Sequence, residues 1–290
     1  MINNIIRDKY TVVEKIGNGK FGTVYLGYSD KENVAIKFDN SLLGILKHEV
    51  EILYYLNEKK SIGIPKIHWY GVSQPYKTEN PILYPCFVMT YYDCTLRNYI
   101  SRQPNKIDII GMINNILSIL NHIHNSFVIH RDLKPDNFMI KNGEIFLIDF
   151  GLATFYIDGK TGIHVECNNY REDIIGTLIY ASYNIHLGHT HSRRDDCIQL
   201  CYIFLYIILG GSLPWEIKYI PAIIGNNNIV QTNIYHPYNQ ERCKMKELSN
   251  ICLIPELNEK IRNGEIIQPF IIYISKCYTL KYDATPTYIL

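Results

Sequence analysis

The chain has 290 residues, of which 47% are hydrophobic and 20% are charged. This length suits about two compact units of roughly 150 residues each, and the hydrophobic share is that of a folded protein rather than a disordered one. Lysines and arginines (29) nearly balance aspartates and glutamates (28), so the net charge of +1 lacks the basic surface of a nucleic-acid binder. We expect a globular protein that does not bind nucleic acid.

The sequence also argues against secretion and against a membrane span. Eight cysteines are scattered without a Cys-x-x-Cys pair, which predicts reduced thiols. Charges interrupt residues 1–9, where a signal peptide would need its apolar core. The longest apolar run, residues 200–209, is about half of the roughly 20 residues that cross a bilayer, and it predicts a buried core helix.

The first part of the chain has the pattern of a small β-rich lobe. Short β-branched and aromatic runs alternate with turns over residues 10–38, which predicts a three-stranded antiparallel meander. A helix with one apolar stripe is predicted at 43–57. A proline-punctuated loop at 71–85 and a buried strand at 86–92 follow, and we end the lobe near Thr90. The stripe consists of Leu46, Val50, Leu53 and Leu56.

The second part of the chain is mainly helical in pattern. Helical periodicity covers 107–127, short strands return around 138–148, and a helix is predicted from Arg194 to Leu209. Residues 224–242 have turn residues without a sustained period, and we interpret them as a loop insertion. The expected fold class is α+β, with a small antiparallel sheet lobe that holds one helix and a larger helical lobe.

A glycine motif, GNGKFG, occupies residues 17–22. The spacing alone is weak evidence, because dinucleotide-binding folds use it to open a helix. Here Gly22 runs into the strand signal TVYL, which predicts the tip of a hairpin. Glycines there let backbone N–H groups approach phosphate oxygens, but this motif alone supports phosphate binding and an ordinary hairpin equally.

Further motifs decide between these interpretations. The next strand, VAIK, ends in Lys37, which by itself would be a solvated edge residue. Glu49 on the following helix can fix this lysine so that its ammonium faces phosphates. HRDLKPDN follows at 130–137, and DFG at 149–151.

With these motifs in this order, the chain resembles the eukaryotic protein kinases. The resemblance implies the bilobal kinase fold over residues 1–290, with lobes 1–90 and 91–290. It implies transfer of the ATP γ-phosphate to protein hydroxyls. Lys134, two residues after Asp132, and the pair Gly176-Thr177 resemble serine/threonine rather than tyrosine kinases.

The resemblance also implies a role for each residue of the motifs. Asp132 would accept the proton of the substrate hydroxyl, and Lys134 would neutralise γ-phosphate charge. Asn137 and Asp149 would hold Mg²⁺, which prefers oxygen ligands, and Lys37 would bind the α- and β-phosphates. The helix glutamate and the residues expected around the rest of the nucleotide are Glu49, Ile16, Gly17, Gly19, Gly22, Val24, Ala35, Met89, Thr90 and Tyr92.

Within the kinases, the chain resembles the casein kinase 1 family from about Tyr10 to Tyr288. The resemblance is carried by the segments GTLIYASYNIHLG at 176–188, SRRDD at 192–196 and GSLPW at 211–215. Ser182-Tyr183-Asn184 stands where most kinases have Ala-Pro-Glu. Asp196 is implied to anchor the catalytic loop, which is the HRDLKPDN segment at 130–137. Vaccinia-related kinases are the alternative, but they usually alter the arginine of HRD, which is intact here. Abundant Ile, Asn and Tyr would suit an AT-rich protist or large DNA virus.

One departure from this family concerns substrate selection. Ile179 replaces the arginine that the family associates with acidic or phosphorylated substrate residues, which predicts weak selection for them. Charge from the neighbouring segment could compensate, and the candidates there are Lys218, Arg242, Lys244 and Lys246.

Alternative interpretations remain for several residues. Two histidine clusters and a cysteine pair invite a zinc interpretation, but core or loop packing is favoured because no matching ligand set closes a tetrahedral site. Thr161 and Tyr170 are phosphorylation candidates in the activation segment. The clusters are His186, His189 and His191; His122, His124 and His130; and Cys197 with Cys201.

Two other classes of protein compete with an active protein kinase. A pseudokinase scaffold would usually have lost catalytic motifs, and an aminoglycoside-type kinase would lack SRRDD and GSLPW. We therefore expect an active, monomeric serine/threonine kinase that uses ATP and Mg²⁺ and acts on protein substrates. We expect it in the cytoplasm, with the nucleus as the alternative, and in the host cell if the protein is viral.

Overall fold

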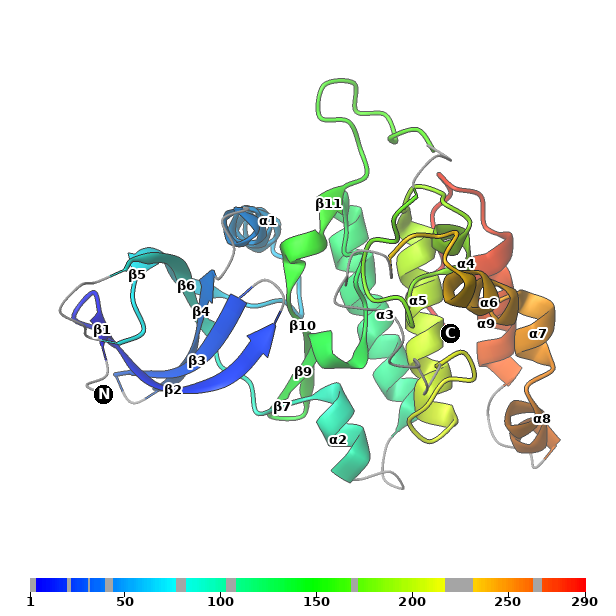
Figure 1. The fold of residues 1–290 in the computed structure, drawn as a ribbon, viewed down its shortest axis with the longest axis horizontal. Coiled ribbons are helices and arrows are strands. Elements are labelled where there is room, and N and C mark those ends of the chain that lie inside the picture. Colours follow the sequence, from blue (N-terminus) through cyan, green and yellow to red (C-terminus); the bar gives the residue numbers. More distant parts are fainter. Residues whose placement is uncertain are drawn as a thin grey trace. The chain divides into compact units, whose positions relative to one another are not determined.

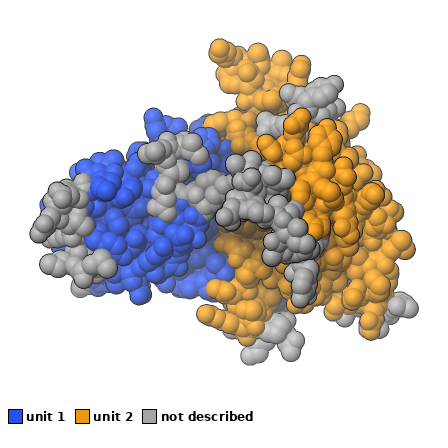
Figure 2. Space-filling model, viewed as in Figure 1, with its two compact units in different colours: residues 1–96, 138–153 blue, residues 97–137, 154–290 orange. Residues whose placement is uncertain are grey.

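The structure is a computed structural model, and it describes residues 4–19, 22–30, 32–39, 44–76, 82–102, 108–167, 172–216, 232–262 and 268–290. The chain divides into two compact units (Figure 2). The first consists of Met1–Leu96 and Phe138–Ala153, and the second of Arg97–Asn137 and Thr154–Leu290. This grouping differs from the division that we expected at residue 90, because the chain returns to the first unit after Asn137.

An antiparallel sheet forms the first unit (Figure 1). Within the described residues its strand order is β1-β2-β3-β4-β6-β5, and its strands are β1 (Ile5–Ile6), β2 (Tyr10–Gly19), β3 (Gly22–Ser29), β4 (Glu32–Asp39), β5 (Ile67–Ser73) and β6 (Tyr84–Thr90). β2, β3 and β4 pair in sequence, which confirms the predicted meander. β6 confirms the predicted strand at 86–92, although it starts and ends two residues earlier.

β5 is a strand that sequence reasoning missed. Its last three residues lie in the segment 71–85, which we expected to be a loop. The pairing with β6 shifts register between Ile67 and Trp69, and most β5 residues are half-buried. The strict alternation that reveals a strand in a sequence is therefore absent.

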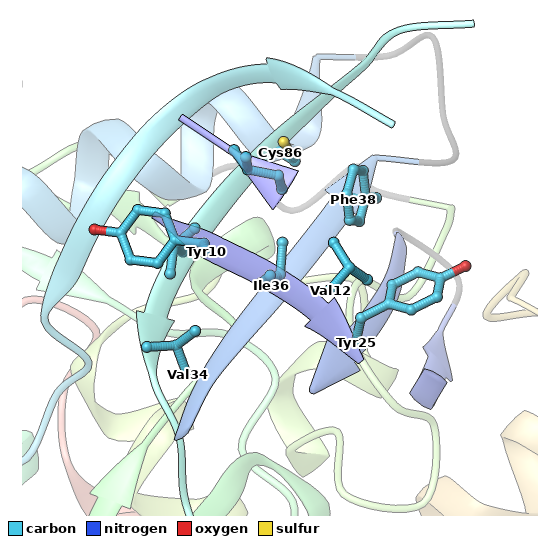
Figure 3. Close-up of a cluster of buried hydrophobic side chains, with 9 residues drawn as sticks. Tyr10, Val12, Tyr25, Val34, Ile36, Phe38 and Cys86 are labelled. Atoms are coloured by element: carbon cyan, nitrogen blue, oxygen red, sulfur yellow. The ribbon is translucent and has the colours of Figure 1, made fainter. Parts of the chain in front are cut away.

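A hydrophobic cluster covers one face of this sheet (Figure 3). Val34, Ile36 and Phe38 are alternate residues of β4, and all three belong to the cluster. Since successive side chains of a strand point to opposite faces, Ala35 and Lys37 face the other side. The cluster consists of Ile6, Tyr10, Val12, Tyr25, Val34, Ile36, Phe38, Cys86 and Val88.

The predicted helix of the first unit is confirmed as α1 (Ile45–Glu58), which contacts β4, β5 and β6. All four residues of its predicted stripe are buried. A second sheet, in the order β10-β9-β7, contains β7 (Cys94–Thr95), β9 (Phe138–Lys141) and β10 (Glu144–Leu147). The pairing of β9 with β7 explains why residues after 137 group with the first unit, and β9 and β10 confirm the short strands predicted around 138–148.

The second unit is mainly helical. α3 (Ile109–Asn125) confirms the helix predicted at 107–127, and the Asp108 carboxylate caps it by accepting from Gly111 N at 2.9 Å. α5 (Arg193–Ile208) is buried from Asp195 to Ile207, as predicted for the apolar run. The other elements are α2 (Leu96–Arg102), β8 (Val128–Ile129), β11 (Thr154–Phe155), α4 (Tyr183–His186), α6 (Pro237–Met245), α7 (Leu248–Cys252), α8 (Pro255–Arg262) and α9 (Gln268–Thr279).

The prediction of a loop over 224–242 is wrong for its last part. Residues 224–231 lie outside the described residues, but α6 begins at Pro237. Proline at the first helical position and the following helix-favouring residues start this helix. Sequence reasoning missed it because the residues that it buries, Asn239 and the following Lys246, are polar and leave no apolar stripe.

In the part of the chain that the structure describes, no helix is both long enough and apolar enough to cross a membrane.

Candidate active site

The glycine motif lies on the β2–β3 hairpin of the first unit. The two strands pair as far as Gly19 and Gly22, and a bulge interrupts their register just before Gly17. A Cβ at Gly22 would lie 2.4 Å from Phe38 O, so a side chain there would displace the backbone. The hairpin that we predicted is confirmed by this pairing, while residues 20–21 at its tip lie outside the described residues.

Residues expected around the nucleotide share one face of the large sheet. Val24 on β3 pairs with Lys37 on β4, and Ala35 on β4 pairs with Met89 on β6. Directly paired residues point to the same face, and so do Ala35 and Lys37, which are two residues apart. The sheet therefore brings these four side chains together on the face opposite the hydrophobic cluster. Ile16, in the bulged part of β2, is 46% exposed.

Thr90 and Tyr92, which we expected near the nucleotide, lie at the end of β6 and just after it. Thr90 N donates to Lys66 O at 3.2 Å. The Tyr92 side chain is buried, and its ring packs on Phe146 of β10 with 4.9 Å between the ring centroids. Tyr92 therefore fixes this segment by packing, which leaves backbone groups as the means by which it could contact a nucleotide.

Lys37 lies at the centre of a charged cluster in the first unit. Its Nζ donates to Glu49 Oε2 at 2.7 Å and to Asp149 Oδ1 at 2.8 Å. Lys37 and Glu49 are buried, whereas the Asp149 side chain is 26% exposed. The predicted pairing of Lys37 with Glu49 is confirmed. Asp149, two residues after the end of β10, also binds Lys37.

Electrostatics keep Lys37 charged. Burial alone would lower the pKa of Lys37, but the carboxylates of Glu49 and Asp149 outweigh it and raise the pKa. Burial raises the pKa of Glu49 to about 7, against the opposing effect of Lys37. With two carboxylates around one ammonium, the ionised cluster has a surplus negative charge, and its most exposed member is a hard oxygen donor. Asp149 therefore fits a cation such as Mg²⁺.

A second cluster surrounds Asp132 in the second unit. Asp132 Oδ1 accepts from Thr177 N and from Thr177 Oγ1, both at 2.7 Å. Lys134 Nζ donates to Asp132 Oδ2 at 2.7 Å and to Thr177 Oγ1 at 3.2 Å. Asn137 Nδ2 donates to Asp132 O at 2.9 Å, so a cation at Asn137 would be met by its carbonyl oxygen. The structure thus unites the three predicted catalytic residues.

Thr177 is a member of this cluster to which sequence reasoning gave no role beyond its place in a motif. The preceding Gly176 has φ 93°, a conformation that favours glycine. A Cβ at Gly176 would also lie 2.5 Å from Arg131 O. The glycine thus lets the chain pass close to the catalytic loop, and this approach places Thr177 on Asp132.

The catalytic loop is held by α5. Asp196 Oδ2 accepts from His130 N at 2.7 Å and Asp196 Oδ1 accepts from Arg131 N at 2.9 Å, which confirms the anchoring expected from the resemblance. Burial would raise the pKa of Asp196, but hydrogen bonds and charge from His124 and His130 lower it, so the carboxylate stays ionised. Gln199 also holds the loop by accepting from Leu133 N at 3.0 Å. Its spacing of three from Asp196, on one helix face, was the signal that we missed.

The histidines and cysteines considered for zinc have other contacts. His124 Nε2 lies 3.0 Å from Asp196 Oδ2, and His186 Nε2 lies 3.0 Å from Lys246 Nζ. Cys197 and Cys201 are fully buried on α5. Among the described residues, no group of three or more His, Cys, Asp or Glu side chains is arranged to hold a metal ion.

Of the two phosphorylation candidates, the structure describes Thr161. Thr161 is exposed in a turn, where its hydroxyl donates to Asp158 Oδ1 at 3.0 Å. Tyr170 lies outside the described residues.

With this geometry established, the comparison with known families is decisive. A family model described as a protein kinase domain matches residues 10–269. The chain belongs to the protein kinase family. The match confirms the predicted α+β kinase fold, with an antiparallel sheet in its N-terminal part and helices in its C-terminal part. Protein kinase domains transfer phosphoryl groups to proteins and generally use ATP and Mg²⁺.

Proposed function

We propose that this protein kinase is catalytically active, uses Mg²⁺-ATP, and phosphorylates serine and threonine residues. The observation that carries the proposal is the Asp132 cluster, in which Thr177 fixes one carboxylate oxygen and Lys134 contacts the other. A kinase that had lost catalysis would not need to keep a buried carboxylate in this fixed orientation, because burying a charge is costly.

The chain's own residues divide the work between two clusters. Asp132 orients the acceptor hydroxyl and accepts its proton, and Lys134 offsets the negative charge that develops on the transferring group. Lys37, fixed by Glu49, positions the nucleotide phosphates. Asp149 and Asn137 supply the oxygen ligands for Mg²⁺. When bound, Mg²⁺-ATP provides the phosphoryl group and neutralises part of its charge.

Contacts between two motifs support assignment to the casein kinase 1 type. Ser182 Oγ and Asn184 Nδ2, in the segment that stands in place of Ala-Pro-Glu, donate to Asp195 Oδ1 at 2.6 and 3.2 Å. Asp195 belongs to SRRDD, and it also caps α5 through Ser192 N at 2.8 Å. The segments on which the resemblance rests thus stabilise one another in this chain.

Phosphoryl transfer from labelled ATP tests the proposal. The purified chain should label casein and serine- or threonine-containing peptide libraries, with little transfer to tyrosine. Asp132→Asn should lower turnover by about 10² to 10⁴-fold while ATP still binds, since a general base contributes about that much.

The matched control is Asp136→Asn. Asp136 lies in the same loop but pairs with Arg97 at 2.8 Å, and 44% of its side chain is exposed. Removing its charge should cost much less turnover. A wild-type protein that binds ATP but labels no acceptor would refute catalysis and favour the alternative of a pseudokinase scaffold. Labelling confined to tyrosine would refute the proposed serine/threonine specificity.

A further inference from the structure

Lys246, which follows α6, is completely buried. Lysines are almost never fully buried without a charged partner. In the described part of the chain Lys246 Nζ pairs with no carboxylate, and burial together with the charge of the nearby Arg242 lowers its pKa well below the usual value. A buried lysine that lacks a counter-charge needs a specific reason to be there.

Neutral groups surround the ammonium. Lys246 Nζ lies 3.0 Å from Leu178 O, 2.7 Å from Ala181 O and 3.0 Å from His186 Nε2. The two carbonyl oxygens accept N–H groups of Lys246, and His186 Nε2 is the third polar atom beside its Nζ. Burial, and then the charge of Lys246, lower the pKa of His186 well below its usual value, which keeps its ring neutral.

Two aromatic rings complete this neutral environment. Lys246 Nζ lies 5.1 Å from the centroid of the Tyr202 ring and 5.6 Å from that of Trp215. Both distances are within the range of cation–π attraction. These contacts hold Lys246 Nζ in place without a carboxylate.

The two carbonyls held by Lys246 belong to one short turn, residues 177–181. Thr177 O accepts from Tyr180 N and Ala181 N, both at 2.9 Å, and Trp215 Nε1 donates to Ile179 O at 2.8 Å. Together with the two bonds from Lys246, these contacts fix the backbone of the turn. The first residue of the turn is Thr177, which holds Asp132 Oδ1 through its amide and its hydroxyl.

We propose that Lys246 is a positioning residue for phosphoryl transfer: by holding Leu178 O and Ala181 O it fixes the turn that presents Thr177 to Asp132. The inference rests on the proposed catalytic role of Asp132. It goes beyond that role because Lys246 lies far along the chain, just after a helix that no kinase motif identified.

A purely structural role is the competing interpretation, and it makes different predictions. Replacing a buried charged group by an apolar one of similar size is often neutral or stabilising, so Lys246→Met removes the donors without creating a cavity. If the role of Lys246 is purely structural, Lys246→Met should lower kcat only as far as it lowers thermal stability. A positioning lysine would lower kcat beyond what its effect on stability explains.

The test combines hydrogen–deuterium exchange with kinetics on the whole chain. In Lys246→Met, exchange of the amides of residues 177–182 should rise, and kcat should fall about tenfold to a hundredfold, as small misplacements of catalytic groups do. KM for ATP should stay unchanged. Thr177→Ala keeps the amide but removes the hydroxyl that the turn presents to Asp132, so in this background Lys246→Met should have a smaller effect on kcat.

The matched control is Asn239→Ala. Asn239 is also buried on α6, and its Nδ2 donates to Asn233 O at 2.8 Å, outside the turn. It should leave exchange at 177–182 and kcat close to wild type. Unchanged exchange in Lys246→Met, or an equal loss of kcat in Asn239→Ala at equal stability, would overturn the inference. A wild type without phosphoryl transfer would instead refute the proposed function, and the exchange result would still decide whether Lys246 fixes the turn.

Discussion

Glu49 shows how one buried carboxylate can control a charged cluster. Glu49 Oε2 lies 2.7 Å from the Lys37 ammonium. Burial disfavours the charge of the Glu49 carboxylate and raises its pKa to about 7. Above that pH the carboxylate is ionised and Lys37 is paired. As the pH falls through 7, protonated Glu49 accumulates and its ion pair with Lys37 is lost, while Asp149 still contacts the lysine.

The expected consequence is an acid limb in the activity profile. kcat/KM for ATP should fall as the pH decreases from about 8 to about 6, with a midpoint near 7, since this parameter reports groups of the free enzyme. Glu49→Gln cannot ionise, so it should show low activity without this limb. The measurement is kcat/KM across this range for both proteins, and an identical midpoint in Glu49→Gln would assign the limb to another group.

Ile179 is the residue at which substrate selection can be tested. Three of the cations that we considered as compensation are now placed: Lys246 is buried and engaged with the turn, Arg242 bonds Asn239 Oδ1 at 3.0 Å, and Lys244 is exposed. Lys218 lies outside the described residues. The suggestion that Lys246 supplies surface charge is therefore wrong, because its ammonium has no access to solvent.

We expect weak preference for phosphoserine or aspartate upstream of the acceptor in the wild type, and a gain of about tenfold to a hundredfold in Ile179→Arg. A charge-assisted hydrogen bond contributes about 1.5 to 3 kcal/mol, which corresponds to that range. Peptide arrays with phosphoserine, aspartate or alanine upstream measure it, with Ile179→Gln as the uncharged control. Strong phosphoserine preference in the wild type, unaltered by Ile179→Arg, would point to Lys244 or Lys218 instead.

At the scale of elements, the catalytic loop depends on α5 rather than on a sheet. Asp196 satisfies two backbone N–H groups of the loop. Asparagine at this position has one acceptor oxygen, and its second side-chain atom is an NH2 group that donates. At least one of the two buried backbone N–H groups is therefore left without a partner. An unsatisfied buried donor costs about 1–3 kcal/mol.

Asp196→Asn should therefore lower the free energy of unfolding by about 1–3 kcal/mol or more, as measured by urea denaturation. Asp158→Asn is a matched control, because Asp158 Oδ1 also accepts from two backbone N–H groups, of Lys160 at 2.9 Å and Thr161 at 2.8 Å, but on an exposed turn. Water can replace those bonds, so the loss should be smaller. Equal losses in the two variants would show that burial does not set the contribution of Asp196.

Elements with a regular pattern could be predicted from the sequence, and elements whose pattern is broken could not. α1 buries Leu46, Val50, Leu53 and Leu56 as predicted, because a stripe at spacings of three and four leaves few alternatives. β5 was missed because a register shift breaks its alternation, and α6 because Asn239 and Lys246 are its buried contacts. Sequence patterns identify apolar burial, whereas polar burial depends on partners from distant segments.

At the scale of the whole molecule, the candidate residues divide into two clusters, one within each compact unit. Lys37, Glu49 and Asp149 belong to the first unit, while Asp132 and Thr177 belong to the second. The motifs named most of these residues in advance. They gave no role to Thr177, because its contact with Asp132 depends on a chain approach that only the folded unit makes.

This division predicts which variants should separate nucleotide binding from transfer. A ligand that binds only the folded state adds RT ln(1 + [L]/Kd) to stability, about 2.7 kcal/mol at a hundredfold excess over Kd. Mg²⁺-ATP should therefore raise Tm equally in the wild type and in Asp132→Asn, because Asp132 acts on the acceptor hydroxyl.

Lys37→Ala and Asp149→Ala should lose this Tm shift by different routes. Lys37→Ala removes a phosphate-binding charge, so its shift should be small with or without Mg²⁺, whereas Asp149→Ala removes a metal ligand and should lose mainly the part of the shift that Mg²⁺ adds. Thermal denaturation with ATP alone and with Mg²⁺-ATP measures both, each variant being compared with its own ligand-free Tm because Lys37→Ala also leaves Glu49 unpaired. A wild-type shift in Lys37→Ala, or an undiminished Mg²⁺ contribution in Asp149→Ala, would contradict the role assigned to that residue.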